Sequence, residues 1–175
     1  MSRKLTHEEL QTRQVDLSKQ PKLPFSIVLN NIRSLYNVGS IFRTADGAGI
    51  EKIWICGITG IPPDTQISKT ALGAEKVVPW EYVRDIKTCV HNLKKLGYEI
   101  IILEQIQGAQ CYQNYRPSNR PVCLIIGNET QGVDPELLNM CDVPLEIEMA
   151  GLKNSLNVTV AFGIVAYHIR NQLKR

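Results

Sequence analysis

Five short apolar runs, separated by polar and helical segments, constrain the fold of this chain more than any other feature. Each run is bounded by polar or turn residues, and most are rich in Ile and Val, which is typical of buried strands. The runs are Phe25–Leu29, Lys52–Cys56, Glu99–Leu103, Val122–Ile126 and Val143–Ile147. Strands that alternate with helices predict an α/β fold with a mostly parallel sheet and helices on both faces.

Helices are indicated by their caps and by their periodicity. A capping box at Thr6 and Glu9 predicts a short helix that stops before Pro21 and Pro24. Further helices are expected over Val38–Ala48 with Asn37 as its cap, Asp85–Leu96, Asp134–Met140 and Leu156–Leu173. No linker separates two domains. Residues 25–175 are therefore predicted to form one domain, preceded by a polar extension over residues 1–24.

Composition permits several functions and excludes few. The 20 basic residues outnumber the 17 acidic ones, and the net charge is +3 with a pI of about 8.6. A nucleic-acid partner is permitted, although the pI is below the value of about 9 that would indicate one. Five cysteines without a C-x-x-C pair favour free thiols in a reducing, cytoplasmic environment.

Other classes are disfavoured by what the sequence lacks. The three histidines are far apart, so no metal site is expected. The first ten residues lack the apolar core of a secretory signal, and the apolar run Val158–Ile169 is too short to span a bilayer. Neither a G-x-G-x-x-G nor a P-loop motif is present, which argues against a dinucleotide fold and a P-loop NTPase.

Three polar clusters stand at junctions between strand, loop and helix patterns: Asn30–Asp46, Gly127–Asp134 and Ser155–Val160. They concentrate Asn, Arg, Glu, Ser and Gly where ligands bind in open α/β sheets, at the carboxyl ends of strands. Together they resemble the three motifs of the SpoU (TrmH-like) branch of the SPOUT superfamily, the RNA ribose 2'-O-methyltransferases. The motifs occur in the family's order and cover about residues 25–170.

The resemblance implies a SPOUT-type α/β fold whose C-terminal part is tied into a deep trefoil knot. It also implies S-adenosylmethionine as cofactor, RNA as substrate, and a homodimer with active sites near the subunit interface. The sequence therefore predicts a methyltransferase that acts on a ribose 2'-hydroxyl of RNA. A non-catalytic RNA-binding module with the same fold and a base-methylating SPOUT enzyme are the alternatives.

Arg43 and Asn37 carry the chemistry of the first cluster. A guanidinium keeps its charge and offers five donors, which suits charge that develops on oxygen, but it accepts protons poorly. From the residues alone, a helix cap at Asn37 and an ion pair of Arg43 with Asp46 explain the pair equally well. The resemblance implies that Asn37 and Arg43 are catalytic. Asn31 and Arg33 match the same motif and are expected to bind RNA.

Glu129 is the ionisable side chain of the loop Gly127–Gly132. It is expected to bind a ligand hydroxyl or to orient Arg43 through a charge-assisted pair, whereas a solvated carboxylate in a turn is the alternative. The resemblance implies a catalytic role for Glu129, because this Glu recurs in the family's second motif. It further implies that Asn157 supports the catalytic Arg43.

The resemblance also implies which residues hold the cofactor, since backbone groups of the family's strand ends and third motif bind its adenine. The corresponding positions are Leu103, Gly127, Ile147, Ser155 and Leu156. Glu148 departs from the family pattern, which usually has Pro after the strand-end Ile. This departure concerns the shape of the loop rather than its backbone donors.

Partners are predicted from charge and from the last helix. Basic residues of the first 24 positions, with Lys69, Lys76 and Lys153, are expected to contact RNA phosphates. A chain this compact favours tRNA over rRNA. The last helix is apolar nearly all round and needs burial on most faces. A C2 homodimer would supply the second surface, and burial in a monomeric core is the alternative.

Overall fold

The computed structural model describes residues 2–128 and 131–174. Within them, seven strands form one sheet in the order β3-β2-β1-β6-β4-β7-β5, and every neighbouring pair is parallel. The strands are β1 (Leu23–Asn30), β2 (Ile50–Cys56), β3 (Trp80–Val83), β4 (Glu99–Leu103), β5 (Gln110–Cys111), β6 (Val122–Ile126) and β7 (Val143–Glu146). The predicted parallel α/β architecture is confirmed, whereas the trefoil knot stays a prediction.

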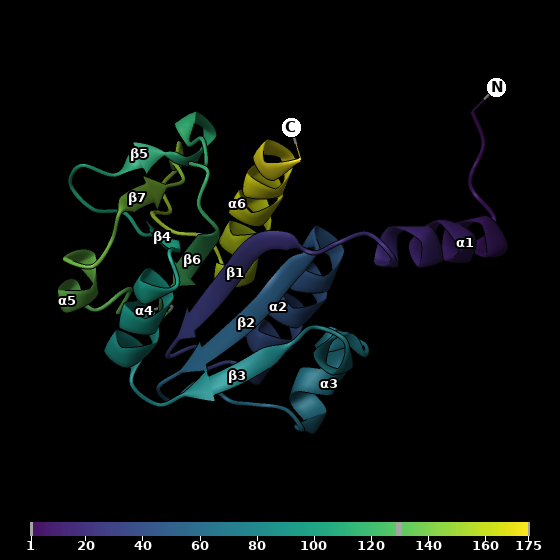
Figure 1. The fold of residues 1–175 in the computed structure, drawn as a ribbon, viewed down its shortest axis with the longest axis horizontal. Coiled ribbons are helices and arrows are strands. Elements are labelled where there is room, and N and C mark those ends of the chain that lie inside the picture. Colours follow the sequence, from purple (N-terminus) through teal and green to yellow (C-terminus); the bar gives the residue numbers. More distant parts are fainter. Residues whose placement is uncertain (1, 129–130, 175) are drawn as a thin grey trace.

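Helices cover both faces of this sheet (Figure 1). The helices α2 (Leu35–Ala48), α3 (Thr65–Ala71) and α6 (Val158–Leu173) pack on one face, and α4 (Ile86–Lys95) and α5 (Pro135–Leu138) pack on the other. Alternation along the strands supplies both cores, because Ile27 and Leu29 face the first group while Val28 faces the second.

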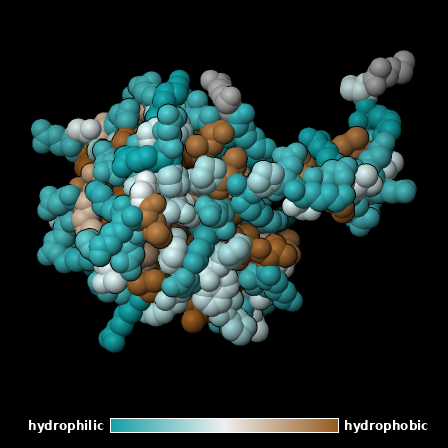
Figure 2. Space-filling model, in the orientation of Figure 1, coloured by the Kyte–Doolittle hydropathy of each residue, from teal (hydrophilic) through white to brown (hydrophobic). Residues whose placement is uncertain are grey.

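The N-terminal helix α1 (His7–Ser18) buries none of its residues. It projects from the body of the protein and presents a mostly hydrophilic surface (Figures 1 and 2). The predicted capping box is present, since Thr6 accepts a bond from the Glu9 backbone and Glu9 accepts one from the Thr6 backbone. Local capping and ion pairs therefore support α1, rather than packing against the domain.

Several boundaries differ from the prediction. The helix α2 begins at Leu35, because the hydroxyl of Ser34 accepts the bond from the Asn37 N–H and replaces Asn37 as the cap. Likewise, Asn157 caps α6, which begins at Val158 instead of Leu156. The helix α5 ends at Leu138 before the predicted Met140. The strands β3 and β5 were not predicted.

The helix α6 buries one face in this single chain rather than most of its surface. Phe162 and Val165 are fully buried, whereas Val160 is 50% exposed and Tyr167 is 43% exposed. Val160 and Tyr167 therefore form apolar surface on α6 that no other part of the described chain covers. Across the described ranges, no helix has both the length and the apolar character needed to cross a bilayer.

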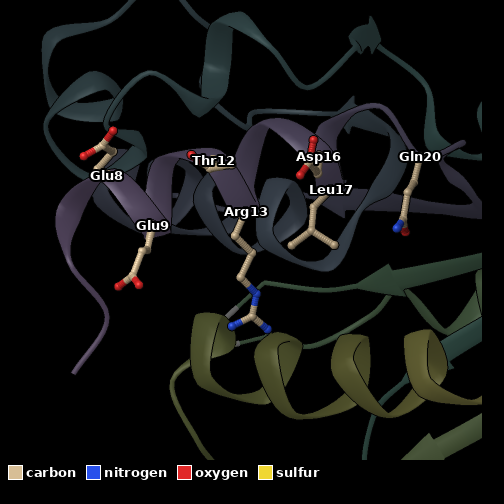
Figure 3. Close-up of a pocket in the computed structure, with 7 residues that line it drawn as sticks. All are labelled: Glu8, Glu9, Thr12, Arg13, Asp16, Leu17 and Gln20. Atoms are coloured by element: carbon tan, nitrogen blue, oxygen red, sulfur yellow. The ribbon is translucent and has the colours of Figure 1, made fainter. Parts of the chain in front are cut away.

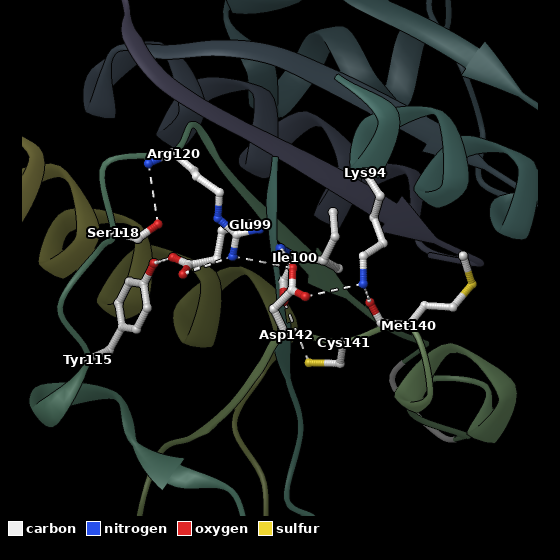
Figure 4. A network of polar contacts seen from close by, with 9 residues as sticks. All are labelled: Lys94, Glu99, Ile100, Tyr115, Ser118, Arg120, Met140, Cys141 and Asp142. Carbon is white, nitrogen blue, oxygen red and sulfur yellow. Dashed lines mark hydrogen bonds and ion pairs between the residues drawn. The ribbon is translucent and has the colours of Figure 1, made fainter. Parts of the chain in front are cut away.

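At the amino end of β4, a network of polar contacts ties the loop after β5 to the sheet (Figure 4). The hydroxyl of Tyr115 donates a bond of 2.5 Å to Glu99, and the guanidinium of Arg120 lies 3.4 Å from the same carboxylate. Asp142 accepts the backbone N–H of Ile100 at 2.8 Å. Because Tyr115 and Arg120 engage the buried carboxylate of Glu99, this end of β4 is closed by protein groups.

Candidate functional site

A cleft of about 680 Å³ opens at the carboxyl ends of β4, β6 and β7. Its walls are the segment after β4, the turn after β6 and the segment between β7 and α6. All five residues that were expected to hold the cofactor line this cleft: Leu103, Gly127, Ile147, Ser155 and Leu156. The fold thus brings these positions together from three separate parts of the chain, while their role stays a prediction.

The chemistry of the cleft is mixed. Leu103, Ile126 and Val158 provide apolar surface, and the backbone of strand ends and loops provides polar groups. Among the described lining residues, Glu104 and Glu146 are the ionisable ones, and neither Lys, Arg nor His is present. Two carboxylates without a basic neighbour favour a ligand that carries positive charge.

The three polar clusters meet through asparagine side chains. The amide of Asn128 donates to the carbonyl of Asn31 at 2.9 Å, which joins the second cluster to the first. The amide of Asn157 donates to Oδ1 of Asn37 at 3.4 Å, which joins the third cluster to the first. Asn31 has a left-handed backbone (φ 58°), and its Oδ1 accepts the N–H of Ile58. Its side chain therefore fixes the loop after β2.

Arg43 lies two turns after the start of α2 and is exposed. It follows Asn37 by six residues, which is about 240° of rotation around a helix, whereas Tyr36 lies seven residues away on the same face as Arg43. Within the described chain, no hydrogen bond or ion pair engages Arg43, and the pair with Asp46 is not formed. Neither Arg43 nor Asn37 lines the cleft.

The structure does not bring the residues that were expected to bind RNA phosphates into the cleft. Arg33, Lys69 and Lys153 are all exposed and do not line it. Glu129 falls outside the described residues. No cluster of three His, Cys, Asp or Glu side chains suited to a metal ion occurs in residues 2–128 and 131–174.

Residues 24–167 match the model of the SpoU rRNA methylase family. The chain belongs to this family. A 23S rRNA (guanosine-2'-O-)-methyltransferase, RlmB, of Vibrio parahaemolyticus is 29% identical over 158 residues, which cover 90% of this chain and 63% of that enzyme. The chain spans less than two thirds of the length of the curated relatives it matches.

Solved structures share the SpoU fold with this chain. The A. aeolicus TrmH/SpoU tRNA modifying enzyme is 25% identical with a TM-score of 0.82, over 95% of this chain and 84% of that one. The AdoMet-bound rRNA methyltransferase from Sinorhizobium meliloti is 25% identical with a TM-score of 0.80, over 89% of this chain and 59% of that one. The predicted SPOUT-type fold class is confirmed.

Proposed function

We propose that this SpoU-family chain transfers a methyl group from S-adenosylmethionine to a ribose 2'-hydroxyl of RNA. The observation that carries the proposal is the meeting of the three clusters, through Asn128–Asn31 and Asn157–Asn37, next to a cleft at the carboxyl ends of parallel strands. The names of the relatives, which are RNA methyltransferases, support the same reaction class.

The cleft suits S-adenosylmethionine in size and in charge. Its volume of about 680 Å³ lies within the range of roughly 300–1,000 Å³ that is common for small-ligand sites. The apolar surface of Leu103, Ile126 and Val158 suits adenine, and the carboxylates of Glu104 and Glu146 suit cationic groups. When bound, the cofactor supplies an electrophilic methyl group on a positively charged sulfur. We assign its contacts to Leu103, Gly127, Ile147, Ser155 and Leu156.

Arg43 is the proposed catalytic side chain for the ribose oxygen. Its guanidinium stays charged at any working pH, so it stabilises negative charge that develops on the 2'-oxygen during transfer. It does not accept the proton, because guanidinium is a donor without acceptor capacity, so the 2'-hydroxyl proton passes to a phosphate oxygen of the RNA substrate as the methyl group leaves the sulfur. Asn37 and Asn157 hold the start of α2 against the start of α6. Glu129 completes the proposed catalytic set.

A homodimer is part of this proposal. Arg43 and Tyr36 share the exposed face of α2, and the exposed Val160 and Tyr167 lie on the neighbouring α6. The two helices run side by side, since a Cβ added at Gly47 would lie 2.9 Å from the hydroxyl of Tyr167. A second copy that covers this apolar surface would place Arg43 at the subunit interface. Sedimentation at micromolar concentration tests this, and a stable monomer would contradict it.

Transfer RNA is the proposed substrate and the cytoplasm the proposed compartment. The free thiols suit a reducing environment, and the exposed Arg33, Lys69 and Lys153 suit phosphate. The A. aeolicus relative is a tRNA modifying enzyme, whereas the V. parahaemolyticus relative acts on 23S rRNA. Mapping ribose methylation in total RNA from a strain that lacks the gene separates the two substrates.

Nucleoside mass spectrometry tests the reaction itself. The full chain is incubated with S-adenosylmethionine and either tRNA or rRNA, and the digested nucleosides are analysed. A methyl group on ribose supports the proposal. A methyl group on a base supports a base-methylating enzyme instead. RNA binding without product supports a non-catalytic module.

A further inference from the structure

Glu104 follows the last residue of β4 and connects three parts of the site. Its backbone N–H donates to the carbonyl of Leu145 in β7 at 2.9 Å. Its carboxylate reaches across to the turn after β6, where Oε2 accepts the N–H of Val133 at 3.1 Å, while Oε1 accepts the N–H of Gln105 at 3.0 Å. The side chain is half-buried and lines the cleft.

The turn that Glu104 reaches is built to admit a carboxylate. Gly132 has φ +68°, and a Cβ at this position would lie 2.3 Å from Oε2 of Glu104. Only glycine combines this backbone conformation with so close an approach. Asn128 and Gly132 also exchange two backbone hydrogen bonds of 3.2 and 2.9 Å, which close the base of the turn.

The turn is therefore anchored on two sides. On one side, the amide of Asn128 bonds the carbonyl of Asn31 in the first cluster. On the other side, Glu104 bonds Val133 next to the cleft. An ionised carboxylate is an acceptor with two oxygens, and each oxygen meets one N–H donor here, so both bonds are charge-assisted.

We propose that Glu104 is a positioning residue of the methyl-transfer site. Its carboxylate fixes Gly132 and Val133 against the end of β4 and so sets the spacing between the cofactor cleft and the Asn31–Asn128 contact. This inference rests on the function proposed above. The other carboxylate of the cleft, Glu146, makes no side-chain hydrogen bond within the described residues, so it shares the charge of Glu104 without its anchoring role.

Glu104→Gln tests the anchor because it keeps the shape of the side chain and removes one acceptor. The new amide group has to face either the Val133 or the Gln105 N–H, donor against donor. We expect amide hydrogen exchange at residues 131–133 of the free protein to rise about tenfold or more, in line with the loss of a hydrogen bond to a charged group. The dissociation constant for S-adenosylmethionine should also rise about tenfold, and turnover should fall.

Glu146→Gln is the matched control, since it removes the same charge from the same cleft. We expect it to leave amide exchange at residues 131–133 unchanged, whatever it does to cofactor affinity. Equal loss of affinity in both variants with unchanged exchange would mean that charge alone matters, and this would overturn the proposal. Raised exchange in Glu104→Gln with wild-type affinity and turnover would overturn it as well.

Gly132→Ala perturbs the same contact from the other side and serves if Glu104→Gln does not fold. We expect the same local rise in exchange. The double variant should lose little more protection from exchange than the worse single variant, because both changes break the same contact. Full additivity would overturn the proposal. The exchange measurements need neither cofactor nor RNA. Failure of the wild-type chain to methylate RNA would therefore reject the proposed function, separately from the anchor.

Discussion

The strand β4 has a glutamate at each end, and their surroundings differ. Glu99 begins the strand, is 6% exposed, and contacts the hydroxyl of Tyr115 and the guanidinium of Arg120. Glu104 follows the strand, is half-buried, and accepts two backbone N–H bonds at the border of the cleft. One carboxylate is enclosed by side chains of the protein, whereas the other faces space that a ligand would fill.

This contrast reflects the polarity of a parallel sheet. The carboxyl ends of strands border the ligand crevice in such folds. At the amino end, polar groups satisfy one another and add cohesion. At the carboxyl end, Ser155 and Leu156 line the cleft and stay exposed in the single chain. Substitutions at the amino end should therefore change stability, and those at the carboxyl end should change function.

Arg43→Ala should show the largest effect and leave stability unchanged. If Arg43 stabilises charge on the 2'-oxygen, its removal should slow single-turnover methylation about 100- to 1000-fold, which is typical for the loss of such a donor. Arg43→Lys should restore little, because an ammonium does not reproduce the planar fork. Calorimetry should show wild-type affinity for S-adenosylmethionine.

The control for Arg43 is Lys95→Ala, which removes an exposed positive charge at the end of α4. It should leave methylation near the wild-type rate. Near-wild-type transfer by Arg43→Ala would reject the catalytic assignment. A large fall in melting temperature for Arg43→Ala would instead indicate a structural role for this side chain.

Tyr115→Phe should have the opposite effect at the amino end. It removes the bond of 2.5 Å to Glu99 inside a nearly fully buried site, so it should lower the free energy of unfolding by about 1–3 kcal/mol. Affinity for S-adenosylmethionine should not change. Tyr82→Phe is the control, because that hydroxyl bonds an exposed carbonyl and its loss should cost less than about 0.5 kcal/mol. If Tyr115→Phe lost turnover while its stability stayed unchanged, the assignment of stability to the amino end of β4 and of function to the carboxyl end would be wrong.

Much of the fold was predictable from local signals. The strands β4 and β6 have the predicted bounds, because EIIIL and VCLII contain runs of consecutive apolar residues that are buried on both faces of the sheet. The strand β3 was missed since its sequence WEYV is short and mostly exposed, and β5 has two residues. These two segments are strands because they pair with the longer neighbours β2 and β7. Local sequence does not indicate which segments will be neighbours in space.

The cleft was predicted through the resemblance, but its supports were not. In the sequence, Glu104 is an ordinary polar residue after a strand. Its hydrogen-bond partner Val133 lies 29 residues further along the chain, so the contact could not be predicted from local sequence. Asn128 is 6% exposed and bonds the carbonyl of Asn31, which is 97 residues away. No periodicity encodes such contacts. The local signal is the pair Gly127 and Gly132, because glycine permits close approach to the backbone and a turn with positive φ, but it does not identify the partner.

Deletion of residues 1–20 tests whether the amino side also contacts RNA. The helix α1 leads into the amino end of β1 and projects from the body of the protein (Figure 1). Arg3 pairs with Glu9 and Lys19 with Asp16, so Lys4 and Arg13 are the deleted basic residues outside these pairs. Figure 3 shows Arg13 extending away from the helix.

If both residues contact phosphates, the deletion should weaken RNA binding and reduce the salt slope by about one to two, since each contact contributes roughly 0.7 to 0.9. The double variant Lys4→Ala, Arg13→Ala should reproduce this with α1 in place. A filter-binding titration over a range of salt concentrations measures the slope. An unchanged slope would confine RNA binding to the rest of the chain.

The smallest expected effect concerns alkaline pH at the closed end of β4. Burial raises the pKa of Tyr115 well above its usual value, and the hydrogen bond to Glu99 adds to the rise. The folded state therefore keeps the phenol proton at pH values where the unfolded chain releases it, above about 10. The stability from this group is complete below that pH. It declines as the pH rises further, by about 1.4 kcal/mol per pH unit for one proton.

The advantage of the wild type over Tyr115→Phe in urea unfolding should therefore shrink between about pH 9 and pH 11. All other titratable groups are common to the wild type and Tyr115→Phe, so they cancel in the difference between the two proteins. If the advantage over Tyr115→Phe is equal at both pH values, Tyr115 ionises as readily in the folded as in the unfolded state. The amino end of β4 would then be open to water, and the contrast between the two glutamates would fail.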